Sequence, residues 1–279
     1  MSKSMLLPRN FHRSFKPERQ YINAMLQFAA AGKSGDYQSI AADTGIPMGT
    51  STGKVPAILD YCRGMGLVRL QGAERSAKKQ PALTPFGRIV FLEDPFLKEK
   101  ITQWVAHLNL CSPLFGAEVW YQTFFKESQS LGYRFSRTDL DTNLSLALGV
   151  DPGGLIGPLI GMYADEASFS NCGAITEQCG NLTRHPAPSE DVFGFGYGAW
   201  LLQLMMDHFP KQGQISTTEL DTVSGWRAIP GWDAFMAKNI LELIERKGLI
   251  EVDRHMNPWL LRAKINLDLA WPKIFNDLI

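Results

Sequence analysis

The chain has 279 residues, of which 45% are hydrophobic and 20% charged, and its formal net charge at pH 7 is zero. This composition is typical of a globular protein with a buried core, and the length allows one large domain or two to three small ones. No apolar run approaches the roughly 20 residues of a membrane-spanning helix, and the first residues are too polar for a secretory signal. We therefore expect a cytoplasmic protein that does not associate with membranes.

The zero net charge hides an uneven distribution of charge along the chain. Residues 1–90 contain 13 lysines and arginines against 5 acidic residues, whereas residues 91–279 contain 15 against 23. A basic segment followed by an acidic remainder indicates an anionic partner for the basic part alone. The alternative is that a short domain drifts a few charges from neutrality without functional meaning.

The basic segment has the element order of a winged helix-turn-helix domain. Apolar periodicity and turn residues predict three helices, then two strands around a polar loop, at 15–33, 36–45, 55–64 or 55–66, 67–71 and 81–87. We predict a DNA-binding domain over 1–98, in which the third helix enters the major groove and the loop reaches phosphates. Such folds also serve as protein-interaction modules, and this alternative stays open.

The start of the third helix places a Gly-Lys pair among hydroxyl residues, in the stretch GTSTGKV. It is not a phosphate-binding P-loop, because Gly49 and Gly53 are only four positions apart and Val55 replaces the magnesium-binding hydroxyl residue. At a helix start, free backbone N–H groups, hydroxyls and a lysine can instead converge on a phosphate or a base edge. The contacts to double-stranded DNA predicted at this helix start and in the polar loop are Thr50, Ser51, Thr52, Gly53, Lys54, Arg75, Lys78 and Lys79.

The remainder of the chain is predicted to be mainly α, with small β wings. We expect buried helices on both sides of Ser112–Pro113, a loop over the glycine- and proline-rich stretch 170–198, and a buried helix over 199–210. The last 70 residues repeat the order helix, helix, strand, turn, strand. We therefore predict a helical domain over 99–210 and a second winged-helix-like unit over 211–279, which we expect to pack against protein more than to bind DNA.

Metal-binding motifs are weak in this sequence. Four scattered cysteines do not form a disulfide framework, and Cys172 and Cys179 lack the spacing of a zinc knuckle. Paired acids can hold a divalent metal for phosphodiester cleavage, although most such pairs only solvate a surface. The candidate pairs are Asp139 with Asp141 and Asp165 with Glu166.

Four segments of the first 110 residues follow one another in a recognisable order: Gly49–Val55, Tyr61–Leu67, Leu83–Leu97 and Trp104–Leu110, which read GTSTGKV, YCRGMGL, LTPFGRIVFLEDPFL and WVAHLNL. In these segments the chain resembles an uncharacterised-domain family found beside bacterial DNA phosphorothioation genes. It departs from the family pattern at Cys62, where a small residue is expected, and at Pro56, which comes one position early.

The resemblance implies a DNA-binding protein of an anti-phage system that installs single-stranded phosphorothioate linkages. One class of the family is described as nicking DNA so that the sulfur-insertion machinery can act. If the chain cleaves DNA, we expect the catalytic group to include Asp94 or His107, which lie in the family-like segments, and the cofactor to be Mg²⁺ or Mn²⁺. The resemblance implies as partners a cysteine desulfurase, an ATPase and an ATP-pyrophosphatase-like sulfur transferase, and we also expect a homodimer.

Two alternatives remain from the residues themselves. His107 shares a helical face with Trp104, as a core histidine would, and Asp94 before Pro95 is equally a turn or cap residue. The alternative function is a non-catalytic winged-helix transcription regulator or adaptor, which would bind DNA without cleaving it.

Overall fold

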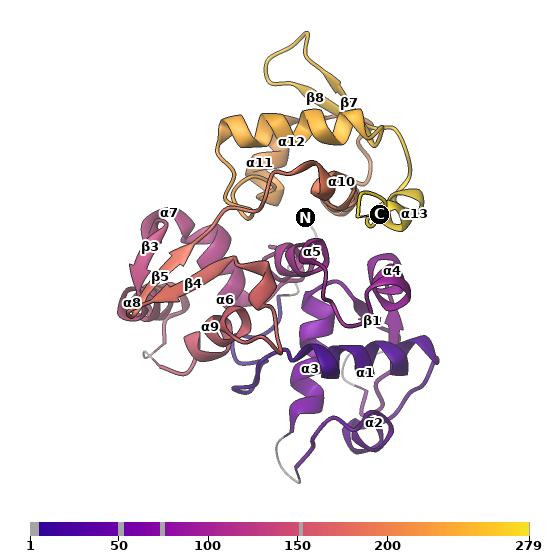
Figure 1. Ribbon diagram of the computed structural model, residues 1–279, viewed down its shortest axis with the longest axis vertical. Helices are drawn as coiled ribbons and strands as arrows, with labels where there is room; N and C mark the ends of the chain where they lie inside the picture. The colour runs from indigo at the N-terminus through magenta and orange to yellow at the C-terminus, as the bar shows by residue number, and fades with distance from the viewer. Residues whose placement is uncertain (1–5, 50–52, 73–75, 151–152, 279) are drawn as a thin grey trace. The chain divides into compact units, whose positions relative to one another are not determined.

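A computed structural model describes residues 6–49, 53–72, 76–150 and 153–278 (Figure 1). Helices dominate these residues, and their strands form small antiparallel sheets, which confirms the predicted mainly α class. The chain divides into two compact units, Met1–His185 and Pro186–Ile279, so the predicted helical domain 99–210 falls partly in each. None of the helices in the described ranges is both long and apolar enough to cross a membrane.

The first unit begins with the three helices and two strands that the sequence predicts. They are α1 (Arg19–Ala30), α2 (Tyr37–Thr44), α3 (Lys54–Gly64), β1 (Val68–Leu70) and β2 (Pro81–Leu83). Asp36 caps α2, because its carboxylate accepts a hydrogen bond from the Ser39 N–H at 2.8 Å, and Gly45 ends the helix in the left-handed region. In the hairpin, β1 and β2 pair with Val68 opposite Leu83.

The strand predicted over 81–87 is too long. β2 stops at Leu83, and α4 (Pro85–Glu93) follows at once. Thr84 is the N-cap of α4, since its hydroxyl accepts a hydrogen bond from the Gly87 N–H at 2.9 Å. Pro85 occupies the first helical position, where its missing N–H has no helical partner to lose. Local capping chemistry therefore ends the strand.

The core of this part forms around α1, α3 and α5 (Lys100–Leu110). On α1, Ile22, Met25 and Leu26 share one buried face. α3 packs against both α1 and α5, and every residue of α5 after Lys100 is buried. Such a helix is a central element rather than a surface one.

The second half of this unit continues with short helices and a small sheet. Its elements are α6 (Glu118–Tyr121), a π-helical segment (Gln122–Lys126), α7 (Ser128–Leu131), β3 (Arg134–Ser136), α8 (Arg137–Leu148), α9 (Ile156–Ala164), a 3-10 turn (Ser170–Cys172), β4 (Ile175–Gln178) and β5 (Asn181–Arg184). The strands lie in the order β3-β5-β4.

The loop predicted over 170–198 is wrong at residues 175–184, which form the β4–β5 hairpin. The two turn residues, Cys179 and Gly180, both have positive φ, 50° and 78°. This is the backbone conformation of a tight two-residue hairpin turn. Cysteine rarely adopts it, so the Cys-Gly pair carries a weaker signal in the sequence than Asn-Gly would.

The second unit contains a long central helix, a sheet and three further helices. Its elements are a 3-10 turn (Asp191–Phe193), α10 (Gly194–His208), β6 (Ile215–Ser216), α11 (Thr217–Ser224), α12 (Ala234–Arg246), β7 (Ile250–Asp253), β8 (Leu260–Ala263), α13 (Leu267–Ala270) and a 3-10 turn (Trp271–Lys273). The strands lie in the order β6-β8-β7.

α10 begins five residues before the predicted helix 199–210, and its first turns contain glycines. At Gly198 a Cβ atom would lie 2.2 Å from Leu249 Cδ1 and 3.1 Å from Ile244 Cγ2. The glycine therefore lets α10 approach the end of α12 and the strand that follows it. Close packing likewise accounts for Gly194, where a Cβ atom would lie 3.0 Å from Leu243 Cγ.

Among the described elements, the order helix, strand, helix, helix, strand, strand occurs twice, and a third part of the chain has the same order without the first strand. We call residues 19–83, 118–184 and 194–263 the first, second and third repeats. In the second and third, the first strand pairs with the last, and the last with the middle one. In the first, the isolated pairing of Gly35 with Lys79 takes the place of the first strand.

Candidate nucleic-acid interface at the start of α3

The candidate interface begins where the chain enters α3. Gly53 is the N-cap of α3 and pairs with Met48, and the Lys54 N–H donates to the Pro47 carbonyl at 2.9 Å. A Cβ atom on Gly53 would lie 2.9 Å from Met48 Cα, so only glycine fits this crossing. Pro56 falls in the first turn, where the missing N–H costs no helical bond.

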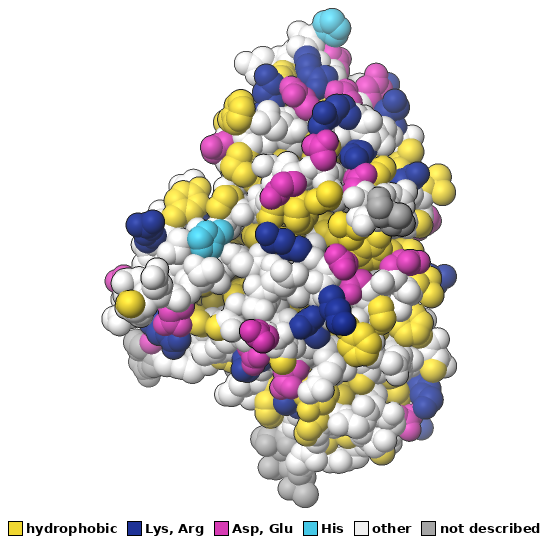
Figure 2. Space-filling view, in the orientation of Figure 1, with side chains coloured by type: hydrophobic (Ala, Val, Ile, Leu, Met, Phe, Trp, Pro, Cys, Tyr) yellow, Lys and Arg dark blue, Asp and Glu magenta, His cyan; other side chains and the backbone are white. Residues whose placement is uncertain are grey.

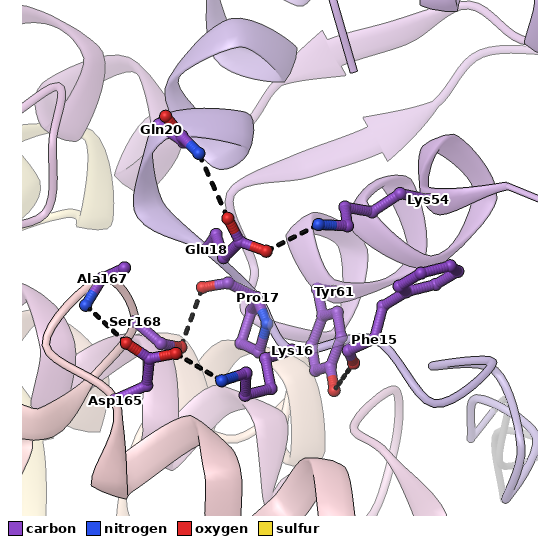
Figure 3. Close-up of polar contacts among 10 residues, drawn as sticks. All are labelled: Phe15, Lys16, Pro17, Glu18, Gln20, Lys54, Tyr61, Asp165, Ala167 and Ser168. Carbon is purple, nitrogen blue, oxygen red and sulfur yellow. Dashed lines mark hydrogen bonds and ion pairs between the residues drawn. The ribbon is translucent and has the colours of Figure 1, made fainter. Parts of the chain in front are cut away.

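The side chain of Lys54 is held within the protein (Figure 3). Its Nζ atom lies 2.6 Å from Glu18 Oε1, and the two side chains are only 15% and 21% exposed. The same ammonium lies 4.6 Å from the ring centre of Tyr21 and 5.5 Å from that of Phe15. A phosphate that bound the Lys54 ammonium would have to replace the Glu18 carboxylate as its partner.

The segment that holds Lys54 is itself fixed by the turn after α9. The Lys16 ammonium pairs with the Asp165 carboxylate, and the Ser168 hydroxyl donates to the Pro17 carbonyl at 3.0 Å (Figure 3). The hydrogen bond from Lys16 is the largest cause that lowers the pKa of Asp165. Sequence reasoning missed Glu18 and Lys16, because neither belongs to a motif or a periodic pattern.

The polar loop between β1 and β2 carries the other predicted contacts. Lys78 is exposed, whereas Lys79 is half-buried and exchanges two backbone hydrogen bonds with Gly35, at 2.7 and 3.1 Å. Arg75 lies outside the described residues, as do Thr50, Ser51 and Thr52 at the helix start. Of the eight predicted DNA contacts, the described ones are Gly53, Lys54, Lys78 and Lys79.

The surroundings of α3 limit what the helix can present. None of its residues, from Lys54 to Gly64, is exposed, and eight of the eleven are buried. A helix in the major groove must expose a face to base edges. α3 therefore has no exposed face of the kind that groove reading requires.

The two predicted catalytic residues both make contacts inside the protein. Asp94 is 6% exposed, and its oxygens accept hydrogen bonds from the N–H groups of Lys98 at 2.7 Å and Glu99 at 3.0 Å. These bonds fix the turn that leads into α5. Asp94 thus has the contacts of a cap residue, which the sequence alternative anticipates.

His107 is fully buried among aromatic side chains. Its Nδ1 lies 2.6 Å from the Tyr163 hydroxyl, which also accepts a hydrogen bond from Trp120 Nε1 at 3.0 Å. Burial lowers the pKa of His107 to about 3, so the imidazole is neutral at pH 7. This environment is that of a hydrogen-bonded core histidine.

Of the four acids considered for a metal, Asp139, Asp141 and Asp165 make contacts within the protein. Asp139 forms a capping box with Ser136, and Asp141 accepts from the Gly153 N–H at 3.1 Å. Across the ranges that the structure covers, no group of three or more His, Cys, Asp or Glu side chains could hold a metal ion. Cys62, Cys111, Cys172 and Cys179 are free thiols.

Comparison with known proteins places this fold. No known family model matches the sequence, and no curated protein matches it. The fold, by contrast, matches that of solved proteins over almost the whole chain. A crystal structure of magnesium-bound SspB has a TM-score of 0.71 and 17% identity, and a second SspB crystal structure has 0.67 and 16%. Each match covers 99% of this chain and 89% of that chain.

The similarity to SspB confirms the resemblance stated from the sequence motifs, and extends it. The motifs cover about the first 110 residues, whereas the shared fold includes both compact units. At 16–17% identity, the comparison establishes the fold alone.

Proposed function

We propose that this chain is a DNA-binding protein of a bacterial DNA phosphorothioation anti-phage system, and that it nicks DNA so that sulfur can be inserted into the backbone. The observation that carries the proposal is the fold shared with SspB over 99% of the chain. SspB is the class of the resembled family that is described as nicking DNA. The four sequence motifs and the surplus of positive charge in residues 1–90 support it independently.

In this proposal the repeats are winged-helix units. The order of elements and the strand order of the sheets are those expected of such units. In the first repeat, the start of α3 and the polar loop would contact phosphates, through Gly53, Lys78, Lys79, Arg75 and the hydroxyls of residues 50–52. Lys54 would join them only after release from Glu18.

Magnesium or manganese is the proposed cofactor, since one of the two SspB structures contains magnesium. Three of the four acids that the sequence analysis singled out do not fit a metal site as they stand, and the described residues contain no group of three or more candidate ligands. The carboxylates of Asp139, Asp141 and Asp165 already accept hydrogen bonds or an ion pair. These carboxylates are therefore not metal ligands in the present arrangement.

The proposed partners follow from the same system. They are a cysteine desulfurase, an ATPase, an ATP-pyrophosphatase-like sulfur transferase and a second copy of this chain. A nick would precede sulfur insertion, so this protein would act on duplex DNA before the sulfur transferase.

A plasmid assay tests the proposal. Supercoiled plasmid is incubated with the purified chain and Mg²⁺ or Mn²⁺, with EDTA as a control, and binding to a short duplex is measured in parallel. The double variant Lys78→Ala/Lys79→Ala, purified identically, controls for contaminating nuclease. Open circles that need the metal and decrease in the variant support a nickase. Binding without nicking would leave the regulator or adaptor, and no binding would refute both.

A further inference from the structure

We infer that the third repeat, not the first, presents the helix that reads duplex DNA, and that α12 and the β7–β8 loop form one binding surface. This inference rests on the proposed DNA-binding function and deepens it. It differs from the sequence prediction, which placed the groove-reading helix at α3 and left the C-terminal unit to contacts with protein.

The burial of the third helix in each repeat carries the inference. α3 has no exposed residue, and α9 has the sequence IGPLIGMYA, which contains no charged side chain. α12 is different: Phe235 is 72% exposed, and Lys238, Asn239 and Arg246 are also exposed. Among the three, only α12 offers a polar face that a groove could accept.

The exposed residues of α12 have the chemistry of base recognition. Phe235, Lys238 and Asn239 lie in the first two turns and share one face, because they are three and four positions apart. In the major groove, a phenylalanine can contact a thymine methyl, a lysine the acceptors of guanine, and an asparagine the donor and acceptor of adenine. Residues near the start of the helix are those that reach base edges.

The β7–β8 loop joins this helix face through one aromatic ring. Lys238 Nζ lies 5.8 Å from the ring centre of Trp259, and the Arg254 guanidinium lies 5.2 Å from it. The loop also exposes His255 and Met256. A cation from the helix and a cation from the loop are thus held over the same ring, which makes a continuous surface of the two elements.

The charge of this surface is mixed, and that decides its role. Arg254 pairs with Glu245 at 2.6 Å, and Lys238 lies 3.9 Å from Glu242. Figure 2 shows positive and negative side chains interspersed over the α12 and β7–β8 end of the chain. Such a surface gains little from phosphate neutralisation. It would contribute sequence preference, while the basic first repeat would contribute salt-dependent affinity.

The experiment compares four forms of the full chain: wild type, Lys238→Ala/Asn239→Ala, Lys78→Ala/Lys79→Ala, and Leu269→Ala as a control. Leu269 is 57% exposed and lies on α13, outside the surface. Each is titrated with a randomised duplex pool and with the duplex that the wild type selects from that pool, at several salt concentrations. Hydrogen exchange verifies that each variant is folded.

We expect the α12 variant to bind the selected duplex at least tenfold more weakly and the pool less than threefold more weakly. The polar-loop variant should lose affinity for both and show a flatter salt dependence. The inference would be overturned if the α12 variant lost affinity equally for the selected duplex and the pool, or lost none. It would also be overturned if the wild type preferred no duplex in the pool. Loss of a protein partner without loss of DNA binding would overturn it too. A wild type that binds no duplex would refute the proposed function itself.

Discussion

Removing the ammonium of Lys54 while keeping its stem tests the main polar contact of the candidate interface. Lys54→Met leaves a side chain of similar length against Tyr21 and Phe15, but leaves the Glu18 carboxylate without its cation. If the ion pair holds the segment before α1, the variant should open this region more often. If Lys54 serves only DNA, its loss should leave the free protein unchanged.

The size of the effect follows from burial. Removing one partner of a fully buried ion pair costs about 3–5 kcal/mol. The Lys54 and Glu18 side chains retain 15% and 21% exposure, so solvent reduces that cost, while the lost cation–π contacts add about 0.5–1 kcal/mol. We therefore expect Lys54→Met to lower the free energy of opening this region by about 2 kcal/mol. At 1.4 kcal/mol per decade, this is roughly a 30-fold rise in the population of opened states.

Amide hydrogen exchange is the appropriate assay, because the chain has two compact units and one global midpoint would mix them. Peptides from α1 and α3 should exchange faster in Lys54→Met. The double variant Glu18→Gln/Lys54→Met should recover about 1 kcal/mol, since it leaves no unpaired charge. Unchanged exchange in both peptides would refute the argument that the ion pair supports the fold. Measuring the salt dependence of DNA binding on the same variants tests separately whether Lys54 also meets a phosphate.

Three further predictions concern residues inside the protein. Burial lowers the pKa of His107 to about 3, below the ordinary 6.5, so only the unfolded chain binds this proton between those pH values. The contribution of His107 to stability should therefore fall as the pH drops through that window, by at most about 1.4 kcal/mol per unit, and amide hydrogen exchange in α5 should show a shallower fall in stability for His107→Gln. Gly53→Ala should speed exchange in α3, because its Cβ would meet the backbone of Met48 at 2.9 Å. Asp94→Asn should cost about 1 kcal/mol through one lost backbone hydrogen bond; a hundredfold loss of nicking at unchanged exchange in α5 would instead make Asp94 catalytic.

Much of the first repeat was predictable because local chemistry decides it. Asp36 and Gly45 mark the two ends of α2 in the sequence as they do in the structure. The break at Ser112–Pro113 separates α5 from α6 as predicted. By contrast, nothing local to Lys54 indicates that its ammonium pairs with a residue 36 positions earlier. Partners distant in sequence are set by packing, which periodicity does not record.

The threefold repeat was predictable in part, and its missed signal lies in capping residues. In the second and third repeats the last residue of the first strand, Ser136 or Ser216, is also the N-cap of the next helix. In the first repeat the N-cap Asp36 follows the bridge residue Gly35. Those helices all end at a left-handed glycine: Gly45, Gly149 and Gly225. In each repeat the first strand of the final hairpin begins two residues after another left-handed glycine. These glycines are Gly66, Gly173 and Gly248. The sequence does not predict the second repeat, because the turn of its hairpin is the atypical pair Cys179–Gly180.

Burial around a helix, unlike its caps, depends on what the rest of the chain brings against it. α3 has the sequence of an amphipathic helix, yet α1, α2 and α5 all pack against it and none of its residues is exposed. The apolar pattern of a sequence identifies the face that a helix buries against its own repeat. It does not show that another helix, from elsewhere in the chain, packs against a second face. For this reason α3, α9 and α12 can occupy the same place in the order of elements and still differ in the surface that they expose.

This difference reconciles the charge of the chain with the proposed function. Positive charge gathers in residues 1–90, where the proposed phosphate contacts lie, and the unit that contains α12 has no such surplus. Base edges, however, are read by hydrogen bonds and apolar contacts rather than by net charge. A helix that exposes Phe235, Lys238 and Asn239 can therefore discriminate sequences without a basic surface. Affinity and specificity would then lie in different repeats, and each could be removed by mutation without the other.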